Sequence, residues 1–152
     1  QWDRLLIQRG LEGLGLVQRQ GGANGVYALQ AALAAEHAKA PRFADTRWET
    51  IASLYDRLLL RLPTAVVALN RAVAHAMAHG PAIGLELLGD IENAPALARY
   101  APLYAAKADF LMRLNRSREA AALFHKAAHL SNNATERRFL QQRASACEIA
   151  SN

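Results

Sequence analysis

Apolar residues recur every three or four positions along almost the whole chain, which is the pattern of amphipathic helices. In the first such segment, residues 3–20, leucines share one face, and a glycine-rich stretch at 21–25 ends it. A second helix runs to Ala40, just before Pro41. Continued along the chain, the pattern predicts an all-α fold of about eight helices.

Local start and stop signals set the boundaries of the later helices. Asp45 or Thr46 is a candidate N-cap of the third helix, and Pro63 stops that helix after Leu62. A fourth, very apolar helix is expected over residues 65–79, opened by Thr64. The remaining signals are Gly80-Pro81 at the fifth helix, a turn with a short helical stretch from residue 92, Pro102 opening the sixth, an Asn115-Arg116 turn, Ser117 and Asn133 as N-caps, a capping box at Glu136, and a tail that frays from Ala150.

Small and large residues alternate in a particular way near the C-terminal end. Ala108, Ala120 and Ala127 fall where two antiparallel helices would cross, and Tyr104 and Phe124 fall beside those crossings. This spacing is typical of the tetratricopeptide repeat (TPR). A shift of 36 residues upstream gives a weaker copy, in which Asn70, Ala72, Gly84, Leu88 and Ile91 take corresponding positions. We therefore expect stacked antiparallel helix hairpins in a TPR-like right-handed superhelix, forming one domain over residues 1–152.

Composition agrees with this fold class. The chain has 152 residues, of which 52% are hydrophobic, enough to bury a continuous helical core. A single cysteine, Cys147, allows no internal disulfide, which fits a cytoplasmic protein. No stretch approaches the ~20 apolar residues of a membrane span. The chain begins at Gln1 without a signal peptide, and we expect it to be cut from a longer protein.

Several phrases occur in order across nearly the whole chain, and together they resemble one family. They are Trp2-Asp3-Arg4, the stretch from Tyr27 to His37, the stretch from Asp45 to Leu58, Val66-Val67-Ala68-Leu69-Asn70-Arg71-Ala72-Val73-Ala74, Gly80-Pro81-Ala82, and Glu136-Arg137-Arg138-Phe139-Leu140. In these phrases the chain resembles the C-terminal TPR-like extension of bacterial extracytoplasmic-function (ECF) RNA polymerase sigma factors. The phrase around Asn70-Arg71 is the most specific, because a generic repeat helix does not require that pair.

The resemblance implies a regulatory role in transcription initiation. In the family, sigma regions 2 and 4 precede this extension, bind core polymerase and read the promoter; neither region is in this chain. The implied partners are the sigma regions of the same chain, the RNA polymerase core, or another regulatory protein. Promoter DNA would be reached through the parent protein.

The sequence offers little support for catalysis or for a metal. His75 and His79 are four residues apart, as are His125 and His129, but neither pair has further ligands nearby. The N-terminal glycines follow no strand and lack the Gly-Lys-Ser/Thr of a phosphate-binding loop. No serine-nucleophile motif is present, and Cys147 has no predictable partner base. We therefore expect a non-enzymatic domain without cofactor or metal.

Charge and buried polar residues supply the candidate interaction sites. The formal net charge is +5, but the basic residues are dispersed, and only Arg137 and Arg138 with their neighbours suggest a patch for DNA or an acidic protein. Asn70 lies on a very apolar helix, where it could fix helix register or take part in recognition. Arg71 is long enough to reach Asp56 or Glu86, and Tyr55 and Asp56 share the ambiguity of Asn70.

The favoured interpretation is that the chain is a regulatory, partner-binding extension of an ECF sigma factor, whose helical groove holds a peptide or a surface of the sigma core. Two alternatives stay open. One is a free-standing TPR-type scaffold, which would lack sigma regions upstream. The other is a helical sensor with a small molecule between its repeats, which would show a sizeable internal cavity lined by polar groups.

Overall fold

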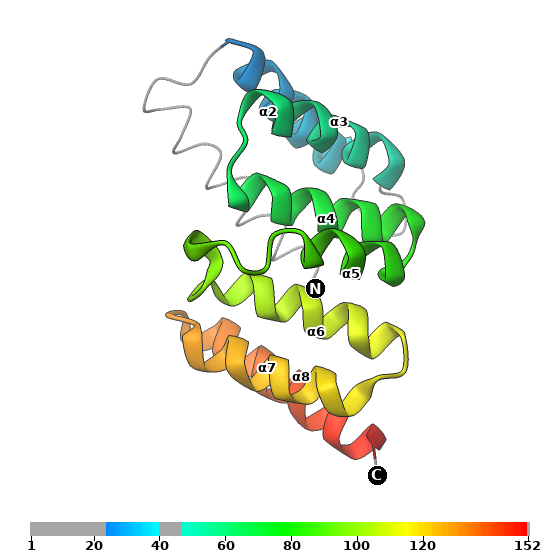
Figure 1. The fold of residues 1–152 in the computed structure, drawn as a ribbon, viewed down its shortest axis with the longest axis vertical. Helices are drawn as coiled ribbons and strands as arrows, with labels where there is room; N and C mark the ends of the chain where they lie inside the picture. The colour runs from blue at the N-terminus through cyan, green and yellow to red at the C-terminus, as the bar shows by residue number, and fades with distance from the viewer. Residues whose placement is uncertain (1–23, 40–46, 152) are drawn as a thin grey trace. The chain divides into compact units, whose positions relative to one another are not determined.

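The structure, a computed structural model, describes residues 24–39 and 47–151. Over these ranges the chain forms seven α-helices and one short 3-10 helix and no strand, which confirms the all-α fold (Figure 1). The expected first helix at 3–20 and the capping residues Asp45 and Thr46 lie outside the described residues. The right-handed sense of the superhelix stays a prediction. No helix in the described ranges is long and apolar enough to cross a membrane.

Internal contacts group the chain into two compact units, Gln1–Ala78 and His79–Asn152. The single domain over residues 1–152 stays a prediction, and each unit is described here by itself. In the first unit, α2 (Asn24–Lys39) packs against α3 (Trp48–Arg61), and α4 (Ala65–His79) follows. The core of this unit contains Val26, Leu29, Leu33, Ile51, Ala52, Leu54, Tyr55, Leu58, Val67 and Ala74.

The boundaries of α4 follow from its flanking residues, as the sequence predicts. Helix α3 ends at Arg61, two residues before Pro63, and Thr64 Oγ1 accepts a hydrogen bond from the Val67 backbone N–H at 3.2 Å. That hydroxyl satisfies one of the N–H groups left without a partner in the first helical turn. Helix α4 buries residues on more than one side, since Val67, Leu69 and Val73 are all shielded from solvent.

The second unit contains α5 (Pro81–Gly89), the 3-10 helix η2 (Pro95–Leu97), α6 (Ala101–Arg113), α7 (Ser117–Leu130) and α8 (Ala134–Ser151). Helix α7 packs against both α6 and α8, and α5 contacts α6 (Figure 1). The small residues of the repeat pattern, Ala108, Ala120 and Ala127, are fully buried, as is Phe124. Small side chains at buried positions let helices approach closely, and the sequence pattern predicts this role for the three alanines.

The turn between α6 and α7 depends on Asn115, whose φ of 63° is in the left-handed region. The Asn115 N–H bonds to the Met112 carbonyl at 3.0 Å, and the Arg116 N–H bonds to the Leu111 carbonyl at 2.9 Å. These two bonds form the Schellman arrangement that closes many helix C-termini, where asparagine is tolerated after glycine. The predicted Asn115-Arg116 turn is therefore confirmed.

Two boundary predictions in this unit are wrong. Ser117 is the first residue of α7 and not its N-cap, a position held by Arg116 without a side-chain cap. The Arg116 side chain instead forms two hydrogen bonds to Glu119, at 2.9 and 2.8 Å, across the first turn. The tail does not fray from Ala150, because α8 continues to Ser151, whose hydroxyl donates to the Glu148 carbonyl at 3.0 Å.

The predicted start of α8 is confirmed. Asn133 precedes the helix, and its Oδ1 accepts a hydrogen bond from the Glu136 backbone N–H at 2.9 Å. This is the N-cap contact that a capping box supplies from its first residue. Glu136 itself is buried.

Candidate functional site

Asp56, Arg71 and His75 form a polar cluster in the first unit, which we call the Asp56 cluster. Arg71 Nε donates to Asp56 Oδ1 at 2.6 Å, and His75 Nε2 lies 2.8 Å from the same oxygen. Asp56 lies on α3, and its two partners, Arg71 and His75, are one helical turn apart on α4. Of the two partners that the sequence allowed for Arg71, the structure shows Asp56.

The Asp56 carboxylate is held in its charged form. Partial burial alone would raise the pKa of Asp56, but hydrogen bonds and charges from Arg71 and His75 outweigh it, so the pKa lies below the usual carboxyl range. The carboxylate remains 44% exposed, and Arg71 is 32% exposed. A partner could therefore reach this cluster, whereas its ion pairs contribute modestly to stability.

Tyr55 and Asn70 flank this cluster in the sequence, but both are buried. Tyr55 is 1% exposed and belongs to the core of the first unit. Within the described ranges, neither the Tyr55 hydroxyl nor the Asn70 Nδ2 has a hydrogen-bond partner. Burial raises the pKa of Tyr55 well above its usual value, which keeps the phenol neutral. Their side chains are inaccessible to a partner at the surface.

Arg137 and Arg138 lie in the second unit and differ from one another. Arg137 Nη2 donates to the Ser131 backbone carbonyl at 3.0 Å, directly after the end of α7. Arg137 therefore supplies a hydrogen-bond donor to a backbone carbonyl between α7 and α8. Arg138 is exposed on α8. The structure does not bring this pair together with Asp56 and Arg71 in one unit.

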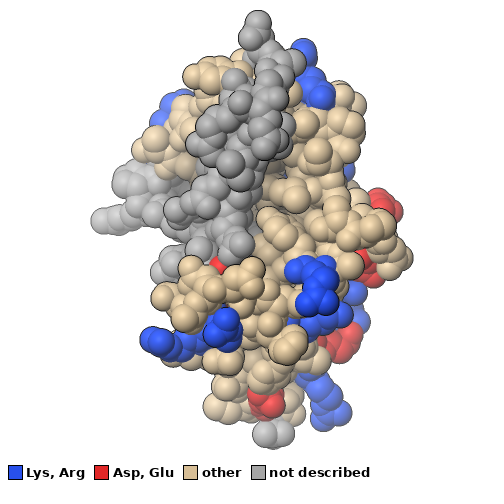
Figure 2. Space-filling model, turned by 90° about the vertical axis from the view of Figure 1, so that its left-hand side faces the viewer, with Lys and Arg blue, Asp and Glu red and all other residues tan. Residues whose placement is uncertain are grey.

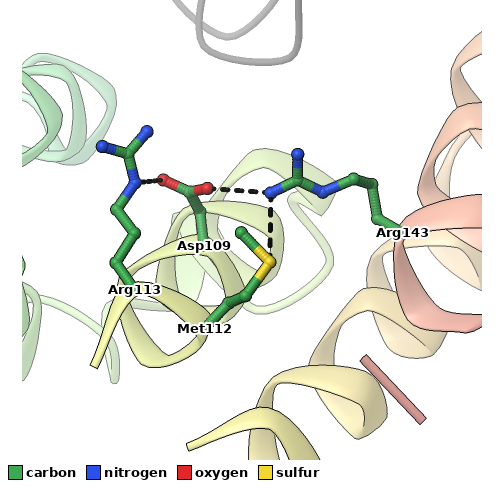
Figure 3. A network of polar contacts seen from close by, with 4 residues as sticks. All are labelled: Asp109, Met112, Arg113 and Arg143. Atoms are coloured by element: carbon green, nitrogen blue, oxygen red, sulfur yellow. Dashed lines mark hydrogen bonds and ion pairs between the residues drawn. The ribbon is translucent and has the colours of Figure 1, made fainter. Parts of the chain in front are cut away.

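A second network, which the sequence analysis missed, surrounds Asp109 (Figure 3). We call Asp109, Met112, Arg113 and Arg143 the Asp109 network. Arg113 Nε donates to Asp109 Oδ2 at 2.8 Å, and Arg143 Nη2 donates to Oδ1 at 3.1 Å. The Asp109 side chain is only 2% exposed, while those of Arg113 and Arg143 are 39% and 27% exposed. A buried carboxylate thus joins two partly exposed guanidinium groups.

Arg143 is held in place from several sides. The same Nη2 lies 3.4 Å from Met112 Sδ, and the guanidinium carbon lies 5.3 Å from the centre of the Phe124 ring. This ring contact is within the range of a cation–π interaction. The bond to Asp109 joins α8 to α6, so Arg143 connects two helices through residues that are 34 positions apart in sequence.

The histidine pairs do not form metal sites in the described residues, where no group of three or more potential ligands occurs. His75 is turned to Asp56, and His125 Nε2 lies 2.9 Å from Glu148 Oε1 on α8. Both His79 and His129 are exposed.

Charged side chains are dispersed on the one face of the molecule that Figure 2 draws. On the face shown in Figure 2, lysine and arginine side chains lie in several separate groups, with carboxylates close to some of them. Among the described pairs, Arg47 binds Glu36 at 2.7 Å and Lys107 binds Glu92 at 3.1 Å. Such pairing reduces the positive field available to a polyanion.

Two hollows lie where α7 begins and α8 ends, with volumes of about 400 and 410 Å³. Both are lined by Arg118 and Ser151, and their other lining residues include Arg116, His125 and Glu148. These hollows lie at exposed helix surfaces and not between repeats, so they give the small-molecule sensor hypothesis no support.

Comparison with known proteins gives one similarity across most of the chain. Over 140 residues the chain is 34% identical to a protein of Rhizobium meliloti (strain 1021) whose name is "Uncharacterized protein R00370". The match covers 92% of this chain and 32% of that relative, so the chain spans about a third of the relative's length. No family model and no solved structure matches.

Proposed function

We propose that this chain is a regulatory, protein-docking extension of an ECF-type RNA polymerase sigma factor. What carries the proposal is the set of ordered phrases that resemble the extension of that family, which run from residue 2 to residue 140. In the structure, the two phrases that contain Asp56 and Arg71 are joined by a 2.6 Å ion pair between α3 and α4. The phrases therefore contain the residues of a contact between α3 and α4 in addition to a helical pattern.

The all-helical fold also supports this role, because stacked helix hairpins present extended surfaces for another protein. A helical docking module acts by binding one conformation of its partner better than another. Here the partner would be the sigma regions of the parent chain or the polymerase core, in the cytoplasm. The module would then bias how often the sigma regions engage promoter DNA, without chemistry of its own.

The test is run-off transcription with purified core polymerase and the parent protein, with and without residues 1–152. The proposal expects deletion to change transcription from the cognate promoter, while transcription by an unrelated sigma factor on the same core stays constant. Unchanged transcription, or the absence of sigma regions from the parent, would leave the free-standing scaffold as the better explanation.

A further inference from the structure

We infer that the exposed face of α3 formed by Arg57, Leu60 and Arg61 is a docking site for an acidic segment of a partner protein. We call these three residues the α3 patch. The site would serve the protein docking proposed above and rests on that function. All three residues belong to the first unit and are exposed, and Leu60 is 86% exposed. Residues three and four positions apart lie on the same side of a helix, so Leu60 and Arg61 share one face with Arg57.

Positive charge without a counter-ion is the first argument for an acidic partner. Among residues 24–39 and 47–151, neither Arg57 nor Arg61 forms a hydrogen bond or an ion pair. The acidic residue next to Arg57 in sequence, Asp56, binds Arg71 and His75 on α4 instead. Two guanidinium groups one helical turn apart are therefore exposed together, and both attract an anion from the same side of α3.

The position of Arg61 is the second argument. Helices α2 and α3 pack side by side (Figure 1). A Cβ atom at position 25 would lie 2.9 Å from Arg61 Cζ, so the guanidinium lies close against Gly25 in the first turn of α2. The C-terminal end of α3 carries a partial negative charge of about half a unit, but the N-terminal end of α2 beside it carries the opposite partial charge. The helix ends therefore do not neutralise Arg61, and a carboxylate would be attracted by both the guanidinium and the end of α2.

A protein segment with acidic and apolar side chains fits the α3 patch better than a nucleic-acid backbone. The affinity for a phosphate backbone grows with each phosphate that is neutralised, which requires a continuous track of cations. The other arginines in the described part of the first unit, Arg47 and Arg71, are paired with carboxylates, so the free positive charge is local. Leu60 adds an apolar side chain to the patch, and an apolar side chain of a protein partner gains free energy by covering it.

The experiment is an NMR titration of the 152-residue chain with a capped Glu-Glu-Leu-Glu-Glu peptide, observing the arginine Nε–Hε and leucine methyl resonances. We expect saturable shifts of the Arg57, Leu60 and Arg61 resonances, and weaker binding as salt is raised. A capped Gln-Gln-Leu-Gln-Gln peptide is the uncharged control and should cause no such shifts. The absence of any saturable shift with the acidic peptide would overturn the inference.

Variants separate this site from general attraction between charges. Arg57→Gln and Arg61→Gln should each weaken binding of the acidic peptide by about two- to fivefold, the usual contribution of an exposed ion pair. Leu60→Gln should also weaken it, because the central leucine of the peptide loses its apolar contact. Arg138→Gln removes the same charge from an exposed position in the other unit, so it is the matched control and should leave binding unchanged. Equal weakening by Arg61→Gln and Arg138→Gln, or tighter binding of a short DNA duplex at the same resonances, would refute a specific site for an acidic segment.

Transcription separates failure of the site from failure of the sigma-factor function. If the acidic peptide shifts the α3 patch but deletion of residues 1–152 leaves transcription unchanged, the docking site stands and the sigma-factor role falls. If deletion changes transcription but the peptide causes no shift, the function stands and this location for it is wrong.

Discussion

Replacing Arg143 with glutamine tests whether the Asp109 network holds α6 and α8 together. The variant loses the 3.1 Å bond to a carboxylate that is only 2% exposed, the contact to Met112, and the contact to the Phe124 ring. A hydrogen bond to a buried charged group contributes about 1.5–3 kcal/mol. The ring contact adds about 0.5–1 kcal/mol at a partly exposed position.

Arg113 still pairs with Asp109 in this variant, so the carboxylate does not become an isolated buried charge. We therefore expect Arg143→Gln to lower the free energy of unfolding by about 2–3 kcal/mol. Arg113→Gln should cost only about 1 kcal/mol, because it removes a contact within one helix, four residues apart, from a more exposed side chain. The order of the two losses matters more than either value.

Urea unfolding followed by far-ultraviolet circular dichroism measures both losses. With a denaturant slope of about 1–3 kcal/mol per molar, a loss of about 2–3 kcal/mol should lower the urea midpoint of the Arg143 variant by about 0.7–3 M. Hydrogen exchange should accelerate in α6 and α8, the helices that the bond joins. The exposed control Arg138→Gln should change stability by less than about 0.5 kcal/mol. If Arg113→Gln costs as much as Arg143→Gln, the network does not act as a tie between helices.

Three further predictions concern separate features. Asn133→Ala removes the N-cap of α8 and should cost about 1 kcal/mol in thermal unfolding, whereas Asn132→Ala, beside it, should be nearly neutral. The pKa of Asp56 is lower in the folded than in the unfolded chain, so its pairing stabilises the fold above about pH 4 and is lost as pH falls through the folded pKa. The difference in urea midpoint between the wild type and Asp56→Asn should therefore close at low pH. A difference that stays constant with pH would contradict this prediction. Gly80→Ala should destabilise the fold by about 1–3 kcal/mol because the φ of Gly80 is +109°, although its surroundings are open. Gly89→Ala is the control, because Gly89 is equally open and has no positive φ, and it should destabilise the fold less. Equal losses of stability in thermal melts would contradict the backbone argument.

Features set by neighbouring residues could be predicted from the sequence. The bounds of α4 and the starts of α5 and α8 depend on Thr64, Gly80-Pro81 and Asn133, each of which acts within one helical turn. Ser117 shows the limit of such signals. A serine there was a plausible cap, but Arg116 uses its side chain to bind Glu119, and the helix begins one residue earlier than a Ser117 cap would allow.

Contacts between distant helices were harder to predict, and the two clusters show why. The pairing of Arg71 with Asp56 joins helices that are consecutive in the chain. The sequence therefore allowed two partners for Arg71, Asp56 and Glu86, and one of them is the observed partner. The pairing of Arg143 with Asp109 requires the relative register of α6, α7 and α8. Only the local half of that network, Asp109 with Arg113 four residues later, has a signal in the sequence.

The two clusters share a chemical plan but differ in burial, and the difference predicts different effects of mutation. In each, one carboxylate is in hydrogen-bond contact with two basic side chains. The Asp56 carboxylate is 44% exposed, so solvent screens its pairs and their loss should affect partner binding more than stability.

The Asp109 carboxylate is 2% exposed and must stay paired in the folded protein. Its presence inside the second unit requires cationic partners, which Arg113 and Arg143 supply, so the loss of these pairs should lower the stability of the fold.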